Sequence, residues 1–293
     1  MNLRRLLVGV AAALGLCTVA IAQTEDGEEQ PVLSSKTFEA FSLRSIGPAF
    51  MSGRIADIEI VQDDPATWYV AVGSGGVWKT ENAGTTWQSL FDGQGSYSIG
   101  SLALDPSDPS RIWVGTGETT GSRHLAYGDG IYLSKDGGKT WEKRGLETSS
   151  QLSTIIVHPE DSNTVWVAAQ GPLWSPGGQR GVYKTTDGGE TWENVLSAGE
   201  YTGATDILID PRNPDRLYAA LWQRHRTVAA YVGGGPESGL YKSEDGGETW
   251  EELKTGLPEG NMGKIGMAIS PMQPDVVYAA IELDRREGGI WRS

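Results

Sequence analysis

One eight-residue pattern occurs four times along the 293-residue chain and limits the folds open to it. The pattern reads Ser/Thr-x-Asp/Asn-x-Gly-x-Thr-Trp, and successive copies begin 54, 51 and 58 residues apart. A period of this length is typical of arrays in which each repeat forms one small supersecondary unit. The copies occupy residues 80–87, 134–141, 185–192 and 243–250, and a fifth is expected to begin at Ser293.

Each copy lies inside a longer unit made of four short runs. An apolar run that ends near Asp-Pro comes first, an aromatic-bearing run second and a Gly-led run third, and the tryptophan of the motif opens the fourth. Runs rich in β-branched and aromatic residues, separated by Gly, Pro, Asn and Asp, are typical of β-strands. The 40 glycines also oppose a helical fold, because each glycine inside a helix costs about 1 kcal/mol relative to alanine.

Four strands per repeat predict an all-β fold, a β-propeller of four-stranded blades with about five units present. Because the fifth unit lacks its last strand, and an open blade would expose an unpaired edge, we expect an incomplete ring that continues past residue 293. The expected first strands cover residues 55–61, 99–104, 154–157, 205–209 and 265–269. The expected second strands cover residues 68–72, 112–115, 165–169, 217–221 and 276–281.

The repeated motif resembles the Asp-box, or BNR repeat, of sialidase-like, sortilin-like and xyloglucanase-like β-propellers. The resemblance covers about residues 45–293. Residues 46–54 and 75–80 are similar to the N-terminal part of large bacterial secreted proteins described as sortilin-like or as glycosyl hydrolases with BNR repeats. The motif indicates architecture far more specifically than activity.

The chemistry of the turn explains the residues of the motif. An Asp or Asn side chain can accept backbone N–H bonds inside the turn, glycine allows a positive φ, and the tryptophan buries a large ring. The structural Asp-box residues are therefore Asn82, Trp87, Asp136, Trp141, Asp187, Trp192, Asp245 and Trp250. The turns lack the alternating oxygen ligands of a calcium loop, and the three histidines are not spaced as a zinc pair. No metal and no cofactor is expected.

The N-terminus predicts export. Residues 1–22 form a signal peptide, with Arg4 and Arg5 ahead of an apolar stretch and a small-residue cleavage site. Residues 23–37 form a flexible acidic leader, and residues 38–293 form the propeller domain, similar to the N-terminal domain of sortilin and truncated at its C-terminus. The mature protein is expected in the periplasm or outside the cell.

The charge of the chain excludes two classes of partner. The formal net charge is -14, whereas nucleic acid and anionic membrane surfaces call for a basic footprint. No segment approaches the ~20 apolar residues of a membrane span. The remaining partners are a peptide, a protein or a carbohydrate.

A binding site is expected where long, unequal loops gather. Loops between second and third strands share one face with the entries to the first strands, opposite the Asp-box turns, and such loops on a rigid scaffold usually carry function. Aromatic and arginine side chains there suit stacking on a sugar or anchoring a peptide. The candidate ligand-binding residues are Arg54, Arg123, His124, Tyr127, Trp174, Arg180, Trp222, Arg224 and His225.

Three functions are open at this point. The main interpretation is an exported module that binds a peptide, protein or glycan without turnover. The alternative is a glycoside hydrolase, xyloglucanase-like or sialidase-like, whose catalytic acids lie partly outside this chain; the third is a structural module of a larger secreted protein. Xyloglucanase-like enzymes carry one acid in a Thr-Asp-x-Gly-Gly stretch of the first blade, where this chain has Gly73. Glu118 and Asp129 are weak catalytic candidates, while Asp57 and Glu282 are further acids without a pairing partner.

Overall fold

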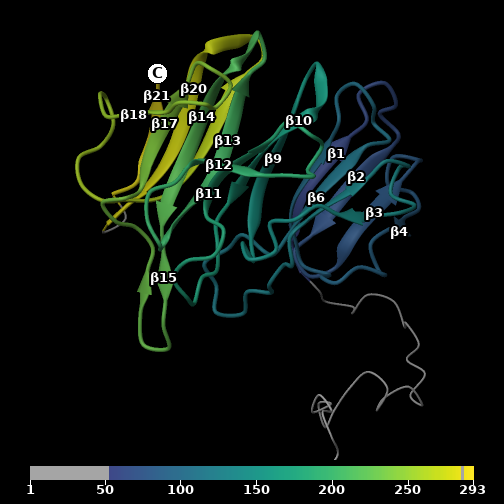
Figure 1. Ribbon diagram of the computed structural model, residues 1–293, viewed down its shortest axis with the longest axis horizontal. Helices are drawn as coiled ribbons and strands as arrows, with labels where there is room; N and C mark the ends of the chain where they lie inside the picture. The colour runs from purple at the N-terminus through teal and green to yellow at the C-terminus, as the bar shows by residue number, and fades with distance from the viewer. Residues whose placement is uncertain (1–52, 285–286) are drawn as a thin grey trace, which may run out of the picture. The chain divides into compact units, whose positions relative to one another are not determined.

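The computed structural model describes residues 53–284 and 287–293, and this part of the chain consists of strands and turns without an α-helix. The strands form four four-stranded sheets, one three-stranded sheet and one small hairpin. The predicted signal peptide (residues 1–22) and acidic leader (23–37) lie outside the described residues. Figure 1 shows the sheets following one another in chain order, from β1 at one end to β21 at the other.

Each sheet is an antiparallel meander whose strands pair in chain order. The first sheet contains β1 (Ile55–Ile60), β2 (Trp68–Val72), β3 (Gly76–Thr80) and β4 (Gln88–Ser89), and the second β5 (Ile99–Leu104), β6 (Ile112–Thr116), β7 (Ile131–Ser134) and β8 (Glu142–Lys143). The third contains β9 (Leu152–His158), β10 (Asp161–Ala169), β11 (Gly181–Thr185) and β12 (Glu193–Leu196). The fourth contains β13 (Thr202–Asp210), β14 (Asn213–Gln223), β17 (Gly239–Ser243) and β18 (Glu251–Leu253), and the fifth β19 (Met262–Ser270), β20 (Gln273–Leu283) and β21 (Gly289–Arg292).

The first strand of each sheet packs against the first strand of the next, as in a propeller. Side chains near the β-bulges link these inner strands. Asp57 Oδ2 accepts from the Leu102 amide at 3.0 Å, and Asp206 Oδ2 accepts from the Met267 amide at 2.7 Å. Burial raises the pKa of both aspartates above its ordinary value. The predicted all-β propeller of four-stranded blades is confirmed, while the incomplete ring stays a prediction.

The Asp-box turns repeat one hydrogen-bond pattern. In the second sheet, Asp136 Oδ1 accepts from the Thr140 amide at 2.9 Å and Oδ2 accepts from the Thr140 hydroxyl at 2.6 Å. Ser134 Oγ in turn accepts from the amide of Gly138, which has a φ of 87° that favours glycine. These hydrogen bonds hold the pKa of Asp136 at about 2. Asp187, Asp245 and Asn82 occupy the same place in their own turns.

Three motif tryptophans, Trp141, Trp192 and Trp250, pack where one sheet meets the next, which we call a seam. In the seam between the first and second sheets, the Trp141 ring lies 5.0 Å from the Phe91 ring, and its Nε1 donates to the Leu90 carbonyl at 2.9 Å. One seam later, Trp192 Nε1 donates to the Arg144 carbonyl at 2.6 Å. The motif therefore joins neighbouring sheets as well as shaping its own turn.

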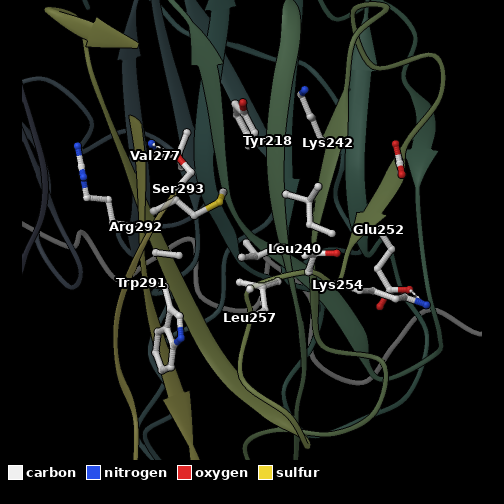
Figure 2. A pocket seen from close by; sticks show the side chains of 16 residues that line it. Tyr218, Leu240, Lys242, Glu252, Lys254, Leu257, Val277, Trp291, Arg292 and Ser293 are labelled. Carbon is white, nitrogen blue, oxygen red and sulfur yellow. Dashed lines mark hydrogen bonds and ion pairs between the residues drawn. The ribbon is translucent and has the colours of Figure 1, made fainter. Parts of the chain in front are cut away.

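The seam between the fourth and fifth sheets contains an open groove of about 640 Å³ (Figure 2). Leu240, Leu253, Leu257, Met267 and Trp291 line much of it. Within residues 53–284 and 287–293, no fourth strand pairs with β21 and no motif tryptophan reaches this seam. The groove lies where Trp141 and Trp192 lie in the earlier seams.

The strand directions place one set of loops on a common face. We call this face the loop rim; it includes loops 73–75, 117–130, 170–180 and 224–238. Loop 224–238 contains a hairpin of β15 (His225–Arg226) and β16 (Tyr231–Val232), which extends beyond the sheets in Figure 1. The sequence does not indicate these two strands, because two-residue strands leave no alternating pattern.

Candidate functional site

The loop rim brings Arg54 and Glu118 into an ion pair. Arg54 Nε donates to Glu118 Oε1 at 2.7 Å, and the Arg54 Nη2 atom contacts the same oxygen. The Glu118 side chain is 4% exposed, whereas that of Arg54 is 57% exposed. Glu118 Oε2 has no hydrogen-bond partner among the described residues. The site is thus a buried carboxylate with one oxygen free and its cation facing solvent.

Gly73 lies directly against this carboxylate. A Cβ atom at residue 73 would lie 2.9 Å from Glu118 Oε1 and 3.5 Å from the Arg54 carbonyl oxygen. The Gly73 amide donates to that carbonyl at 2.8 Å, which fixes the approach. Glu118, from the second sheet, therefore fills space that a side chain at residue 73 of the first sheet would take.

The loop that carries Glu118 is held by cations from two other sheets. Lys264 Nζ donates to the Thr119 carbonyl at 3.2 Å, and Arg224 Nη1 donates to the carbonyl of residue 120 at 3.4 Å. Arg226 Nη2 donates to the carbonyl of residue 121 at 2.6 Å. Three consecutive carbonyls of loop 117–130 thus bind the fourth and fifth sheets, which positions Glu118 in a fixed backbone.

Two predicted ligand-binding arginines are buried. Arg180 donates to the Gly177, Gln170 and Ser175 carbonyls at 2.7, 2.9 and 2.8 Å and also contacts the Pro172 carbonyl. Arg224 contacts the Gln151 amide oxygen and donates to the Gly171 carbonyl at 3.0 Å. Burial lowers the pKa of Arg180 to about 10 and that of Arg224 to about 9. Both guanidinium groups organise the rim loops from beneath the surface, and their role in ligand binding stays a prediction.

The other predicted ligand-binding residues differ in exposure. Trp222 is buried and donates from Nε1 to the Gly233 carbonyl at 3.0 Å. Trp174 and His225 are half-buried, and the His225 ring packs on Tyr201 at 4.6 Å. The exposed residues are Arg54, Arg123, His124 and Tyr127.

The side chain of Asp129, the other candidate acid, contacts residues of its own sheet. Its Oδ2 accepts from the Tyr132 hydroxyl at 2.6 Å and lies 3.5 Å from Lys143 Nζ. Both partners belong to the second sheet, on β7 and β8. Among the described residues, Asp129 and Glu118 contact different partners and do not form a pair.

A second part of the rim, between the fourth and fifth sheets, contains a pocket of about 610 Å³. Tyr231, Asn261 and Glu282 line it together with glycines. Glu282 Oε2 accepts from the Lys264 amide at 3.4 Å, and the Lys264 amine holds residue 119 beside Glu118. Sequence reasoning did not select Asn261, because it lies between two sheets in a position with no recurring motif.

Two kinds of site are absent from the part of the chain that the structure describes. No group of three His, Cys, Asp or Glu side chains there could hold a metal ion. No helix in that part is long and apolar enough to cross a membrane.

Comparison with known proteins finds similarity to a sortilin family model and to xyloglucanases. The family model Sortilin-Vps10 ("Sortilin, neurotensin receptor 3") matches residues 129–264. A xyloglucanase of Paenibacillus sp. is 22% identical over 94% of this chain and 28% of its own length. An oligoxyloglucan-reducing end-specific xyloglucanase of Emericella nidulans is 24% identical over 84% of this chain and 28% of its own length. The chain thus spans less than a third of these relatives.

Solved structures agree on the fold. An ancestral GH74 enzyme superimposes with a TM-score of 0.62 at 17% identity, over 82% of this chain and 30% of that one. The GH74 xyloglucanase from Xanthomonas campestris superimposes with a TM-score of 0.59 at 17% identity, over 82% of this chain and 36% of that one. At these identities the likeness establishes the propeller fold.

Proposed function

We propose that this Asp-box β-propeller forms part of a xyloglucanase-like glycoside hydrolase that acts on a β-linked glucan across the loop rim. The observation that carries the proposal is the buried Glu118 carboxylate beside Gly73, the position where such enzymes have a first-blade acid. Xyloglucanases of 22% to 24% identity, which align with most of this chain, support the substrate class.

The geometry of Glu118 fits one of the two acid roles. Glycoside hydrolysis needs one carboxylic acid that protonates the leaving oxygen and one carboxylate that activates water or attacks the sugar. Glu118 Oε1 contacts Arg54, while Oε2 has no hydrogen-bond partner among the described residues. We therefore assign Glu118 the role of the carboxylate that activates water or attacks the sugar. In this proposal the second catalytic acid belongs to a part of the protein outside this chain.

The test is turnover by the whole protein on xyloglucan and on an unsubstituted β-glucan, followed by reducing ends and product length. We expect Glu118→Gln to lower kcat by about 10²–10⁴-fold, the range for losing an acid–base group. Asp129→Asn is the matched control, since it removes an acid from the same loop and should leave kcat within a few-fold. Full turnover by folded Glu118→Gln would contradict the proposal.

A module that binds glycan without turnover is the second candidate, and the missing side chain at Gly73 favours it. The same assay separates the two functions. Saturable binding of xyloglucan without new reducing ends would support the binding module and reject hydrolysis.

A further inference from the structure

The pocket between the fourth and fifth sheets has a preformed aromatic wall. We call it the hairpin pocket; it is lined by Tyr231, Asn261, Glu282, Leu283, Asp284 and neighbouring glycines. Tyr231 is 41% exposed, and the Arg226 guanidinium lies 4.3 Å from its ring centroid. Arg226 also donates to the carbonyl of residue 121 at 2.6 Å, which ties the hairpin to the loop carrying Glu118. A ring fixed in this way binds without the entropic cost of ordering it first.

Glycines line the hairpin pocket and allow a close approach of its two walls. A Cβ atom at Gly234 would lie 2.7 Å from the Met262 carbonyl, and one at Gly263 would lie 3.0 Å from Glu282 Oε2. The Gly235 amide donates to the same Met262 carbonyl at 3.1 Å. The loop therefore packs backbone to backbone on β19, which leaves no room for a Cβ atom at these positions.

The polar groups of the hairpin pocket suit hydroxyl groups. Glu282 and Asn261 are both exposed, and Glu282 Oε1 has no hydrogen-bond partner among the described residues. Together they offer acceptors and an amide donor in the pocket that Tyr231 also lines. Ligand sites typically combine apolar walls with a few convergent polar groups. A sugar residue matches this arrangement, since it has one apolar face and a ring of hydroxyls.

We propose that the hairpin pocket binds one sugar residue of a glucan chain, with its apolar face on Tyr231 and its hydroxyls on Glu282 and Asn261. The inference rests on the proposed function for its substrate class. Lys264 connects the hairpin pocket with the Glu118 site, because its amide contacts Glu282 and its amine holds residue 119 beside Glu118. A glucan bound in the hairpin pocket would thus be positioned along the rim toward Glu118.

Binding of xyloglucan oligosaccharides to the whole protein, measured by calorimetry, tests this site. We expect Tyr231→Ala to raise Kd at least about 10-fold, Tyr231→Phe to leave Kd unchanged, and Glu282→Gln to raise it a few-fold. Tyr278→Ala is the matched control, since Tyr278 is 42% exposed on β20 and does not line the pocket. Unchanged affinity in folded Tyr231→Ala would overturn the proposal.

A second variant guards against a folding defect. Asn261→Trp leaves the wall intact and fills the hairpin pocket, so it should also weaken binding at least about 10-fold. Measuring Kd in the Glu118→Gln background separates the two proposals, because binding there does not depend on turnover. Loss of binding in Tyr231→Ala without turnover in the wild type would reject hydrolysis and keep the sugar site. Turnover by the wild type together with an unchanged Kd in Tyr231→Ala and Asn261→Trp would reject the sugar site and keep hydrolysis.

Discussion

The Asp-box face and the loop rim are built from the same sheets, yet only the first repeats from one sheet to the next. Asp136, Asp187 and Asp245 each accept from the amide of the threonine four residues later, at 2.9–3.0 Å. On the rim, the first sheet has a three-residue connection, whereas the fourth carries a hairpin. The comparison teaches that the repeated residues build the scaffold, while the residues that do not repeat form the candidate site.

The largest expected effect is on the Asp-box side. Trp192→Ala should lower the free energy of unfolding by about 3 kcal/mol, because the ring packs on Trp113 and joins two sheets. Trp87 is the same motif residue in the first sheet, but its side chain is 41% exposed and donates within its own turn. Trp87→Ala should therefore lower the free energy of unfolding by only about 1 kcal/mol, the value of one hydrogen bond. Urea unfolding of both variants measures the difference. Equal losses would show that the seams do not depend on the motif tryptophan.

A smaller loss of stability is expected on the rim. Arg54→Ala leaves the buried Glu118 carboxylate without its ion pair and should cost about 2 kcal/mol, the range for a hydrogen bond to a charged group. Arg123→Ala is the matched control, because this exposed arginine donates to the residue 228 carbonyl at 3.4 Å and its loss should cost under about 0.5 kcal/mol. Chemical denaturation at neutral pH compares the two. An Arg54→Ala protein as stable as the control would mean that Glu118 does not need this cation.

The smallest effect concerns acid pH. The pKa of Asp136 and of Asp245 is about 2 in the folded protein, below the ordinary value of 3.8. Their contribution to stability is therefore complete above about pH 4 and is lost as the pH falls toward 2. Asp245→Asn should flatten the fall of Tm over this window, because an amide does not titrate and Asn82 already serves in the first turn. Parallel Tm profiles for wild type and variant would contradict this role of the Asp-box carboxylates.

The strands of the scaffold could be predicted because the sequence pattern that indicates them is local and repeats from one unit to the next. The expected strand 68–72 coincides with β2, and 99–104 coincides with β5, since each is a short apolar run between turn residues. The longer strands β10 and β14 begin earlier than expected, at Asp161 and Asn213, because polar residues extend the hairpins beyond the apolar run.

The candidate site could be predicted only in part, because its contacts join residues far apart in the sequence. The sequence selected Arg54 and Glu118 separately, but not their pairing across 64 residues beside Gly73. It also selected Arg180 and Arg224 as ligand-binding candidates without their burial, since nothing local shows that loop carbonyls surround a guanidinium. Tyr231 and Asn261 meet because a hairpin folds back on β19, which is a property of the loop's path.

The open groove between the fourth and fifth sheets has a consequence for how the chain emerges from the ribosome. In the earlier seams, the tryptophan that seals two sheets comes from the later unit, so Trp141 seals a seam whose first sheet begins at Ile55. During synthesis each newly made sheet must expose an apolar edge until the following motif is translated. Vectorial synthesis thus makes the growing end the part most open to misassociation. The groove beside Trp291 has the form of a seam just before it is sealed.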